Sequence, residues 1–146
     1  MYPAEICLEV SSVDTDWVGC LMSDPVFLHC MLFSTEAYCD ERSGRERSPL
    51  TDFHFLEALR LLQERISDPH SPFAISDQTI MTVVILALTA DHLGDQTSVE
   101  NHMGGLQKMV SLRGGFVAMG SELRSKICRF VQAVSAVLCF MQNNRF

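Results

Sequence analysis

The sequence predicts an all-α fold, in which about five amphipathic helices pack as an antiparallel array. Polar capping residues recur ahead of apolar stretches, and two of them are followed by proline. Within these stretches apolar residues repeat at intervals of three and four, which is typical of a helix with one buried face. No two apolar runs are joined by a convincing β-hairpin turn. Residues 1–22 are acidic and poorly periodic, so we expect an irregular N-terminal segment there and a helical region over residues 23–146.

The first helix is predicted after Ser23-Asp24-Pro25, where a capping side chain precedes a proline suited to the first helical turn. The stretch 40–47 that follows this helix holds six charges around Ser43-Gly44, which predicts a solvated loop. The apolar face of the helix is formed by Val26, Phe27, Cys30, Met31, Phe33, Ala37 and Tyr38.

The second helix is predicted after Ser48-Pro49, which repeats the cap and proline signal. Arg60 and Glu64 stand one turn apart on its polar side, where a pair contributes roughly a few tenths of a kcal/mol. The two prolines within residues 68–72 end this helix. Its apolar stripe consists of Phe55, Leu59, Leu62 and Ile66.

The third helix is predicted after the cap at Ser76-Asp77. Residues 80–88 are apolar all round and rich in β-branched side chains, so periodicity alone leaves a buried strand open. The length of the run, the cap and a C-terminal stop at Gly94 favour a central buried helix.

The fourth helix is predicted from Thr97 and Glu100, which have the spacing of a capping box, to Gly114-Gly115. Gly104-Gly105 within it predicts a close approach to another helix. Its apolar face carries Val99, Met103, Leu106, Met109 and Val110. A fifth helix opens at Ser121-Glu122, and its apolar face carries Leu123, Ile127, Phe130, Val134, Val137, Leu138 and Met141.

The charge balance limits the classes of partner. The formal net charge is −7, which disfavours nucleic acid as a ligand because that affinity comes mainly from Lys and Arg. No Lys or Arg precedes Arg42, so we expect neither a secretory signal nor a transit peptide. The longest apolar run, residues 80–90, is too short to span a bilayer. These features predict a soluble protein of the cytosol or nucleus.

The six cysteines match the number of ligands in a binuclear zinc cluster, but no two of them are separated by only two residues. In a reducing compartment we interpret them as small buried apolar side chains with free thiols. They are Cys7, Cys20, Cys30, Cys39, Cys128 and Cys139.

Three groups of residues are candidates for chemistry. The first is a set of His and carboxylate side chains around the turn between the third and fourth helices. Such side chains can bind Zn²⁺, but their spacing matches no metal motif, and two of them have capping roles. The set consists of Asp91, His92, Asp95, Glu100 and His102.

The second candidate is Cys30 with His29 and His54, a thiol nucleophile with a base, although neighbours in sequence point to different sides of a helix. The third candidate is the basic segment of Arg124, Lys126 and Arg129, whose three charges are typical of a solvated helix face. We therefore predict no enzyme and no catalytic, cofactor-binding or metal-binding residues.

Several stretches together resemble the fungal-specific transcription factor regulatory domain, the helical region found in many zinc-cluster regulators. The resemblance covers roughly residues 16–146. It is most specific in the run from His102 to Val110, continued by Leu112-Arg113-Gly114-Gly115-Phe116. It also covers Trp17, the stretches 23–29, 53–54, 57–62 and 66–68, and the stretch 76–80.

The resemblance implies transcriptional regulation and a nuclear location. Members of that family carry a six-cysteine zinc cluster near the amino terminus and a longer helical region. This chain has no such cysteine spacing, so we expect a partial domain without its own DNA-binding part.

The function predicted from the sequence is therefore a regulatory module that binds other protein chains or itself, without direct nucleic acid or membrane binding. Self-association is expected because a partial helical array leaves an apolar face uncovered. The alternatives are a domain that senses a small metabolite and, least favoured, a metal-dependent hydrolase that uses His92 and His102.

Overall fold

The computed structural model describes residue 19, residues 23–68 and 70–115, and residues 121 and 125. Its helices are α2 (Pro25–Arg42), α3 (Pro49–Ser67), α4 (Asp77–His92) and α5 (Gln96–Leu112). The described residues include no strand, which confirms the predicted all-α class. The predicted fifth helix lies outside them, although Ser121 and Ser125 are helical. The predicted N-terminal segment also lies outside them, apart from residue 19.

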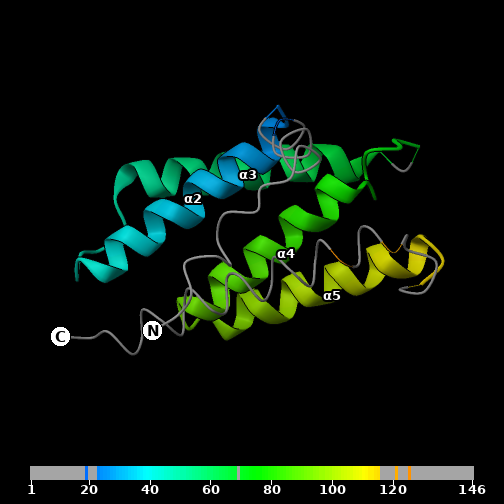
Figure 1. The fold of residues 1–146 in the computed structure, drawn as a ribbon. Helices are drawn as coiled ribbons and strands as arrows, with labels where there is room; N and C mark the ends of the chain where they lie inside the picture. The colour runs from blue at the N-terminus through cyan, green and yellow to red at the C-terminus, as the bar shows by residue number, and fades with distance from the viewer. Residues whose placement is uncertain (1–18, 20–22, 69, 116–120, 122–124, 126–146) are drawn as a thin grey trace, which may run out of the picture.

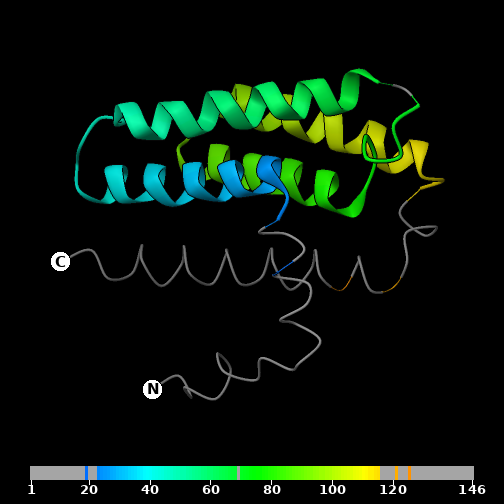
Figure 2. The same cartoon turned by 90° about the horizontal axis from the view of Figure 1, so that it is seen from above.

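The four helices form two antiparallel hairpins that pack as two layers. α2 and α3 form one layer, α4 and α5 form the other, and α4 lies below α2 and runs in nearly the same direction (Figure 1). Seen from above, α3 lies beside α2 along the whole length of α2 (Figure 2). α2 and α4 provide most of the contact between the layers, so the core lies mainly between these two helices.

Local capping bonds explain where the helices begin. The side chains of Asp24, Ser48 and Ser76 accept hydrogen bonds from backbone N–H groups two or three residues further on, as predicted. The predicted capping box at Thr97 and Glu100 is wrong. α5 is instead capped by Asp95, whose carboxylate accepts both the N–H of Ser98 at 3.0 Å and its hydroxyl at 2.6 Å. This double acceptor starts the helix earlier, and the residues of the predicted box stay exposed within its first two turns.

Glycine in the left-handed conformation ends two helices as predicted. Gly94 follows α4 with φ of 73° and Gly114 follows α5 with φ of 92°. Only glycine takes this conformation without a steric penalty, so these positions release the chain from the helix.

α4 is the central buried helix of the array. Every residue from Thr79 to Ala87 is buried, so the helical prediction is confirmed and the strand alternative is wrong. Ile80, Met81 and Leu86 are at most 1% exposed. A helix that is apolar all round needs burial on every side, which explains why this segment lies at the centre.

The prediction that residues 40–47 form a solvated loop is wrong for the first part of that stretch. α2 continues to Arg42, and Asp40 is only 3% exposed. Its carboxylate accepts the backbone N–H of Ser48 at 2.8 Å and the hydroxyl of Thr51 at 2.6 Å. These two bonds hold the pKa of Asp40 below its ordinary value, against the raising effect of burial. The carboxylate therefore joins the end of α2 to the start of α3.

Candidate interaction surface

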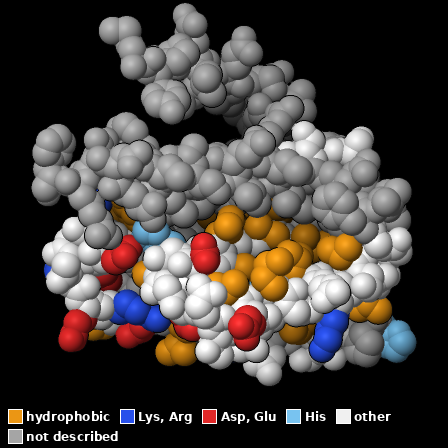
Figure 3. All heavy atoms as spheres, turned by 90° about the horizontal axis from the view of Figure 1, so that it is seen from below, with side chains coloured by type: hydrophobic (Ala, Val, Ile, Leu, Met, Phe, Trp, Pro, Cys, Tyr) orange, Lys and Arg blue, Asp and Glu red, His pale blue; other side chains and the backbone are white. Residues whose placement is uncertain are grey.

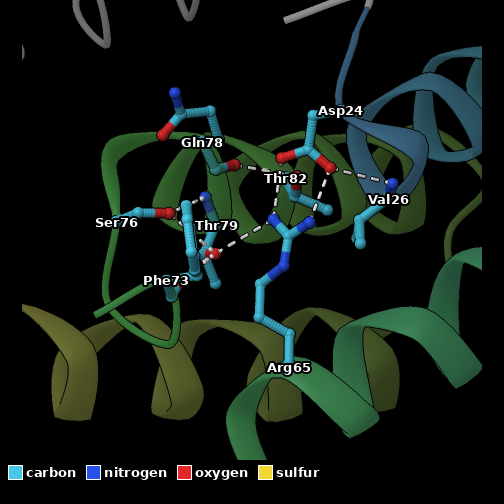
Figure 4. A network of polar contacts seen from close by, with 8 residues as sticks. All are labelled: Asp24, Val26, Arg65, Phe73, Ser76, Gln78, Thr79 and Thr82. Atoms are coloured by element: carbon cyan, nitrogen blue, oxygen red, sulfur yellow. Dashed lines mark hydrogen bonds and ion pairs between the residues drawn. The ribbon is translucent and has the colours of Figure 1, made fainter. Parts of the chain in front are cut away.

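An ion pair fixes the start of α2 against the end of α3. The two terminal nitrogens of Arg65 donate to the two carboxylate oxygens of Asp24 at 2.6 and 2.7 Å (Figure 4). The same carboxylate caps α2 by accepting the N–H of Val26 at 3.0 Å. Burial raises the pKa of Asp24, but the bonds and charge of Arg65 and the capping N–H groups outweigh it, and the net shift is downward. Arg65 also reaches the hydroxyl of Thr79 at 3.4 Å, which extends the network to the start of α4.

The polar side of α3 exposes large apolar side chains. Leu50 is 52% exposed, Phe53 54% and Leu56 64%. They stand three residues apart, so they lie on successive turns and form one strip on the helix. Leu32 of α2 is 37% exposed and stands one turn beyond His29. The ring of His29 packs against that of Phe53, with 5.9 Å between the ring centroids, so Leu32 is grouped with the strip on α3. We call these four side chains, Leu32, Leu50, Phe53 and Leu56, the Phe53 surface.

Two histidines meet beside this surface. His29 of α2 and His54 of α3 are half-buried, and their Nδ1 atoms lie 3.0 Å apart. One imidazole must donate and the other accept in this contact. The ring of Phe53 packs edge-on against both imidazoles, at 5.9 Å from His29 and 5.2 Å from His54. The pair thus joins the two helices at the margin of the Phe53 surface.

The structure separates Cys30 from the two histidines proposed as its bases. The thiol is 0% exposed and donates to the backbone carbonyl of Thr82 in α4 at 3.7 Å. Burial raises the pKa of the Cys30 thiol, so it stays protonated. His29 and His54 point instead to each other. This arrangement corresponds to a packed thiol, whereas Cys39 is exposed, so the prediction that the cysteines are buried is wrong at that position.

The His and carboxylate residues near the turn between α4 and α5 have separate contacts and do not form one site. His92 lies 2.5 Å from the carboxylate of Glu41 in α2, without the alignment of a hydrogen bond, and its ring faces Tyr38 at 5.4 Å. Asp95 caps α5. His102 is half-buried, and desolvation lowers its pKa although the charge of Asp95 opposes the shift. Within residues 23–68 and 70–115, no three His, Cys, Asp or Glu side chains are grouped to hold a metal ion.

The remaining sequence candidates give no site in the described residues. Arg124, Lys126 and Arg129 lie outside them. A Cβ atom built on Gly104 or Gly105 meets no described atom within 4 Å, so the predicted close helix approach is not seen.

The underside of the molecule, on the side of α4 and α5, also carries apolar side chains, with charged ones at its margins (Figure 3). Met103 and Leu112 of α5 are 50% and 74% exposed. They stand nine residues apart, which places them on opposite sides of the helix. They therefore form no common strip, unlike the residues of the Phe53 surface.

These observations define a class of protein. It is an all-α module whose buried and half-buried polar groups serve helix caps and helix junctions, and which exposes an apolar strip. The chain matches the family model of the fungal specific transcription factor domain over residues 18–143, and it belongs to that family. No curated protein and no solved structure matches it. Among the described helices, none combines the length and the apolar character that crossing a membrane requires.

Proposed function

We propose that this chain is a transcription-regulatory module that acts through contacts between the Phe53 surface and another protein chain. Membership of the fungal specific transcription factor domain family supports the regulatory role and favours a nuclear location. The same membership favours a role without catalysis, because the family is a regulatory domain.

The exposed strip on α3 is the observation that carries this proposal. The centre of the buried face of α3 is formed by Thr51, Ala58 and Leu62, so the core does not need Phe53 or Leu56. Large apolar side chains that stay in water on successive turns cost solvation free energy. A partner helix or groove that covers them recovers this free energy, and aromatic anchors of this kind dominate binding at interfaces.

The charge of the chain supports a protein partner in preference to DNA. The net charge is −7, and phosphate neutralisation by Lys and Arg supplies most nucleic-acid affinity. Several described arginines are engaged by carboxylates of the same chain, namely Arg45, Arg47, Arg60, Arg65 and Arg113. Pairing of this kind reduces the positive charge that remains for phosphates.

The proposal is tested by tethering the chain to a promoter. The chain is fused to an unrelated DNA-binding module in a fungal cell, and transcription of a reporter with the matching site is measured. We expect the fusion to change reporter transcription severalfold relative to the DNA-binding module alone, while the unfused chain has no effect. Binding of the purified chain to DNA is measured in parallel by fluorescence anisotropy at physiological salt. An unchanged reporter, or tight binding to particular DNA sites, would contradict the proposal.

A further inference from the structure

We infer that His29 and His54 form a two-imidazole site for a divalent transition-metal ion, with Ni²⁺ or Cu²⁺ as the best-fitting ions. The inference rests on the geometry of the histidine pair and is independent of the proposed function. A bound ion would join α2 to α3 at the margin of the Phe53 surface.

The distance between the two nitrogens fits a shared ion. The Nδ1 atoms lie 3.0 Å apart, and imidazole nitrogens bind such metals at about 2.0–2.1 Å. For an ion at that distance from both atoms, the nitrogen–metal–nitrogen angle is about 94°. This angle is close to the 90° between neighbouring ligands in square-planar and octahedral sites, which Cu²⁺ and Ni²⁺ prefer over the tetrahedral geometry of Zn²⁺.

The protonation chemistry is balanced without an additional reactant. In the neutral pair one Nδ1 carries a hydrogen and donates it to the other Nδ1. Metal binding needs both Nδ1 lone pairs, so the donor imidazole changes to the tautomer with its hydrogen on Nε2. The neutral pair therefore takes up the ion with no net loss of a proton, and the metal replaces the hydrogen bond as the link between the helices.

The backbones that carry the two histidines are held on both sides of the pair. Towards the start of α2, the ion pair between Asp24 and Arg65 joins the helices. Towards its end, the rings of Phe33 and Phe55 pack at 4.6 Å. Cys30, the neighbour of His29, is 0% exposed. This support holds the two backbones in place, so only the imidazole rings have to turn towards the ion, which reduces the entropy that metal binding would otherwise cost.

The neighbouring Glu57 does not supply a third ligand. The carboxylate of Glu57, one turn from His54, is within electrostatic reach of His29. Its oxygens accept hydrogen bonds from Arg60 at 2.6 and 3.0 Å, so the carboxylate is engaged and the guanidinium offsets its charge. The chain supplies two ligands, and water occupies the other coordination positions.

Titration of the metal-stripped full chain with Ni²⁺ tests the inference. We expect one Ni²⁺ per chain by calorimetry, no binding of Mg²⁺ because it prefers oxygen ligands, and a higher melting temperature with Ni²⁺. His29→Gln and His54→Gln should each weaken Ni²⁺ binding at least about tenfold. His70→Gln, which changes an exposed histidine in the connection after α3, is the matched control and should bind Ni²⁺ as the unmodified chain does.

A second measurement uses the unmodified chain and does not depend on folding of the variants. Diethyl pyrocarbonate modifies accessible imidazoles, and mass spectrometry locates the modified residues. We expect Ni²⁺ to protect His29 and His54 but not His70. Equal Ni²⁺ affinity of a His29→Gln/His54→Gln variant would overturn the inference. Failure of Ni²⁺ to bind the unmodified chain, or to protect the pair more than His70, would also overturn it.

Discussion

Arg65 near the end of α3 donates two charged hydrogen bonds, of 2.6 and 2.7 Å, to the carboxylate of Asp24. Asp24 stands 41 residues earlier in the chain. The side chains are only 16% and 11% exposed, so water screens the pair less than it would a surface ion pair. The same carboxylate caps α2. One side chain therefore both starts a helix and fixes that helix against its neighbour.

Replacement of Asp24 should separate these two roles. Asp24→Ala removes the cap and leaves Arg65 unpaired in a partly buried place, which we expect to lower the free energy of unfolding by about 2–4 kcal/mol. Asp24→Asn keeps an oxygen for the cap and removes only the charge, so its loss should be about half as large. Urea denaturation of both variants measures the two values. If the free energy of unfolding fell by less than about 0.5 kcal/mol in both variants, as is typical of a neutral surface substitution, the ion pair between Asp24 and Arg65 would not stabilise the fold.

The parts of this fold that the sequence could predict are those decided by local interactions. The caps at Ser48 and Ser76 involve a hydroxyl and an N–H three residues away, so a short motif reveals them. The ending at Gly94 is equally local. The central position of α4 followed from its uniformly apolar composition.

The predictions that were wrong concern contacts between residues that only the folded chain brings together. Asp40 was predicted to lie in a solvated loop because charged residues surround it in the sequence. Its partners Ser48 and Thr51 come within hydrogen-bond distance only when the α2–α3 hairpin forms, so the sequence alone does not reveal them. The predicted stripe of α3 included Ile66, which is 44% exposed. Ala58 and Leu62 mark the centre of the buried face instead.

The candidate site was equally hard to predict from the sequence. His29 and His54 drew attention only as bases for Cys30, and nothing local shows that the two imidazoles face each other while the thiol turns towards α4. Phe53 is one apolar residue among many in an amphipathic stretch. Its exposure becomes visible only after the packing of α2 on α3 fixes which side of the helix is buried.

Asp40 should matter more for stability than any fully exposed carboxylate near it. Asp40→Ala leaves the N–H of Ser48 and the hydroxyl of Thr51 without their acceptor. We expect a clear fall in melting temperature, measured by circular dichroism. Glu46→Ala, at an exposed position of the same connection, is the matched control and should leave the melting temperature nearly unchanged. Equal effects of the two substitutions would contradict the bridging role of Asp40.

The lowered pKa of His102 predicts a mild loss of stability in weak acid. Desolvation favours the neutral imidazole in the folded chain, whereas the unfolded chain binds a proton near pH 6.5. Between that pH and the lower folded pKa, the unfolded state binds more protons, so stability falls as the pH falls through this window. His102→Gln should flatten this part of the profile, and His70→Gln should not. Urea midpoints measured from pH 8 to pH 5 test this, and parallel profiles for His102→Gln and the unmodified chain would refute it.

A second acid window belongs to the aspartates. The pKa values of Asp24, Asp40 and Asp95 lie below the ordinary value of 3.8. Their contribution to stability is therefore present above about pH 4 and is lost as the pH falls through the lowered folded values. The Asp24→Asn variant should lose less stability between pH 5 and pH 2 than the unmodified chain, measured by the same urea midpoints. An equal loss in both would show that Asp24 carries no such contribution.

The central claim, that the Phe53 surface binds a partner and is not needed for folding, is tested most directly by one comparison of reporter transcription. Phe53→Ser/Leu56→Ser removes two exposed anchors, and Phe73→Ser/Leu112→Ser removes an equally exposed pair elsewhere, since these side chains are 65% and 74% exposed. Both variants should keep the melting temperature of the unmodified chain within a few degrees, because substitutions at exposed positions change stability by only about 0.5 kcal/mol each. In the promoter-tethered assay, we predict that the first variant loses most of the effect on transcription and that the second retains it. Full activity of the Phe53→Ser/Leu56→Ser variant would contradict the account.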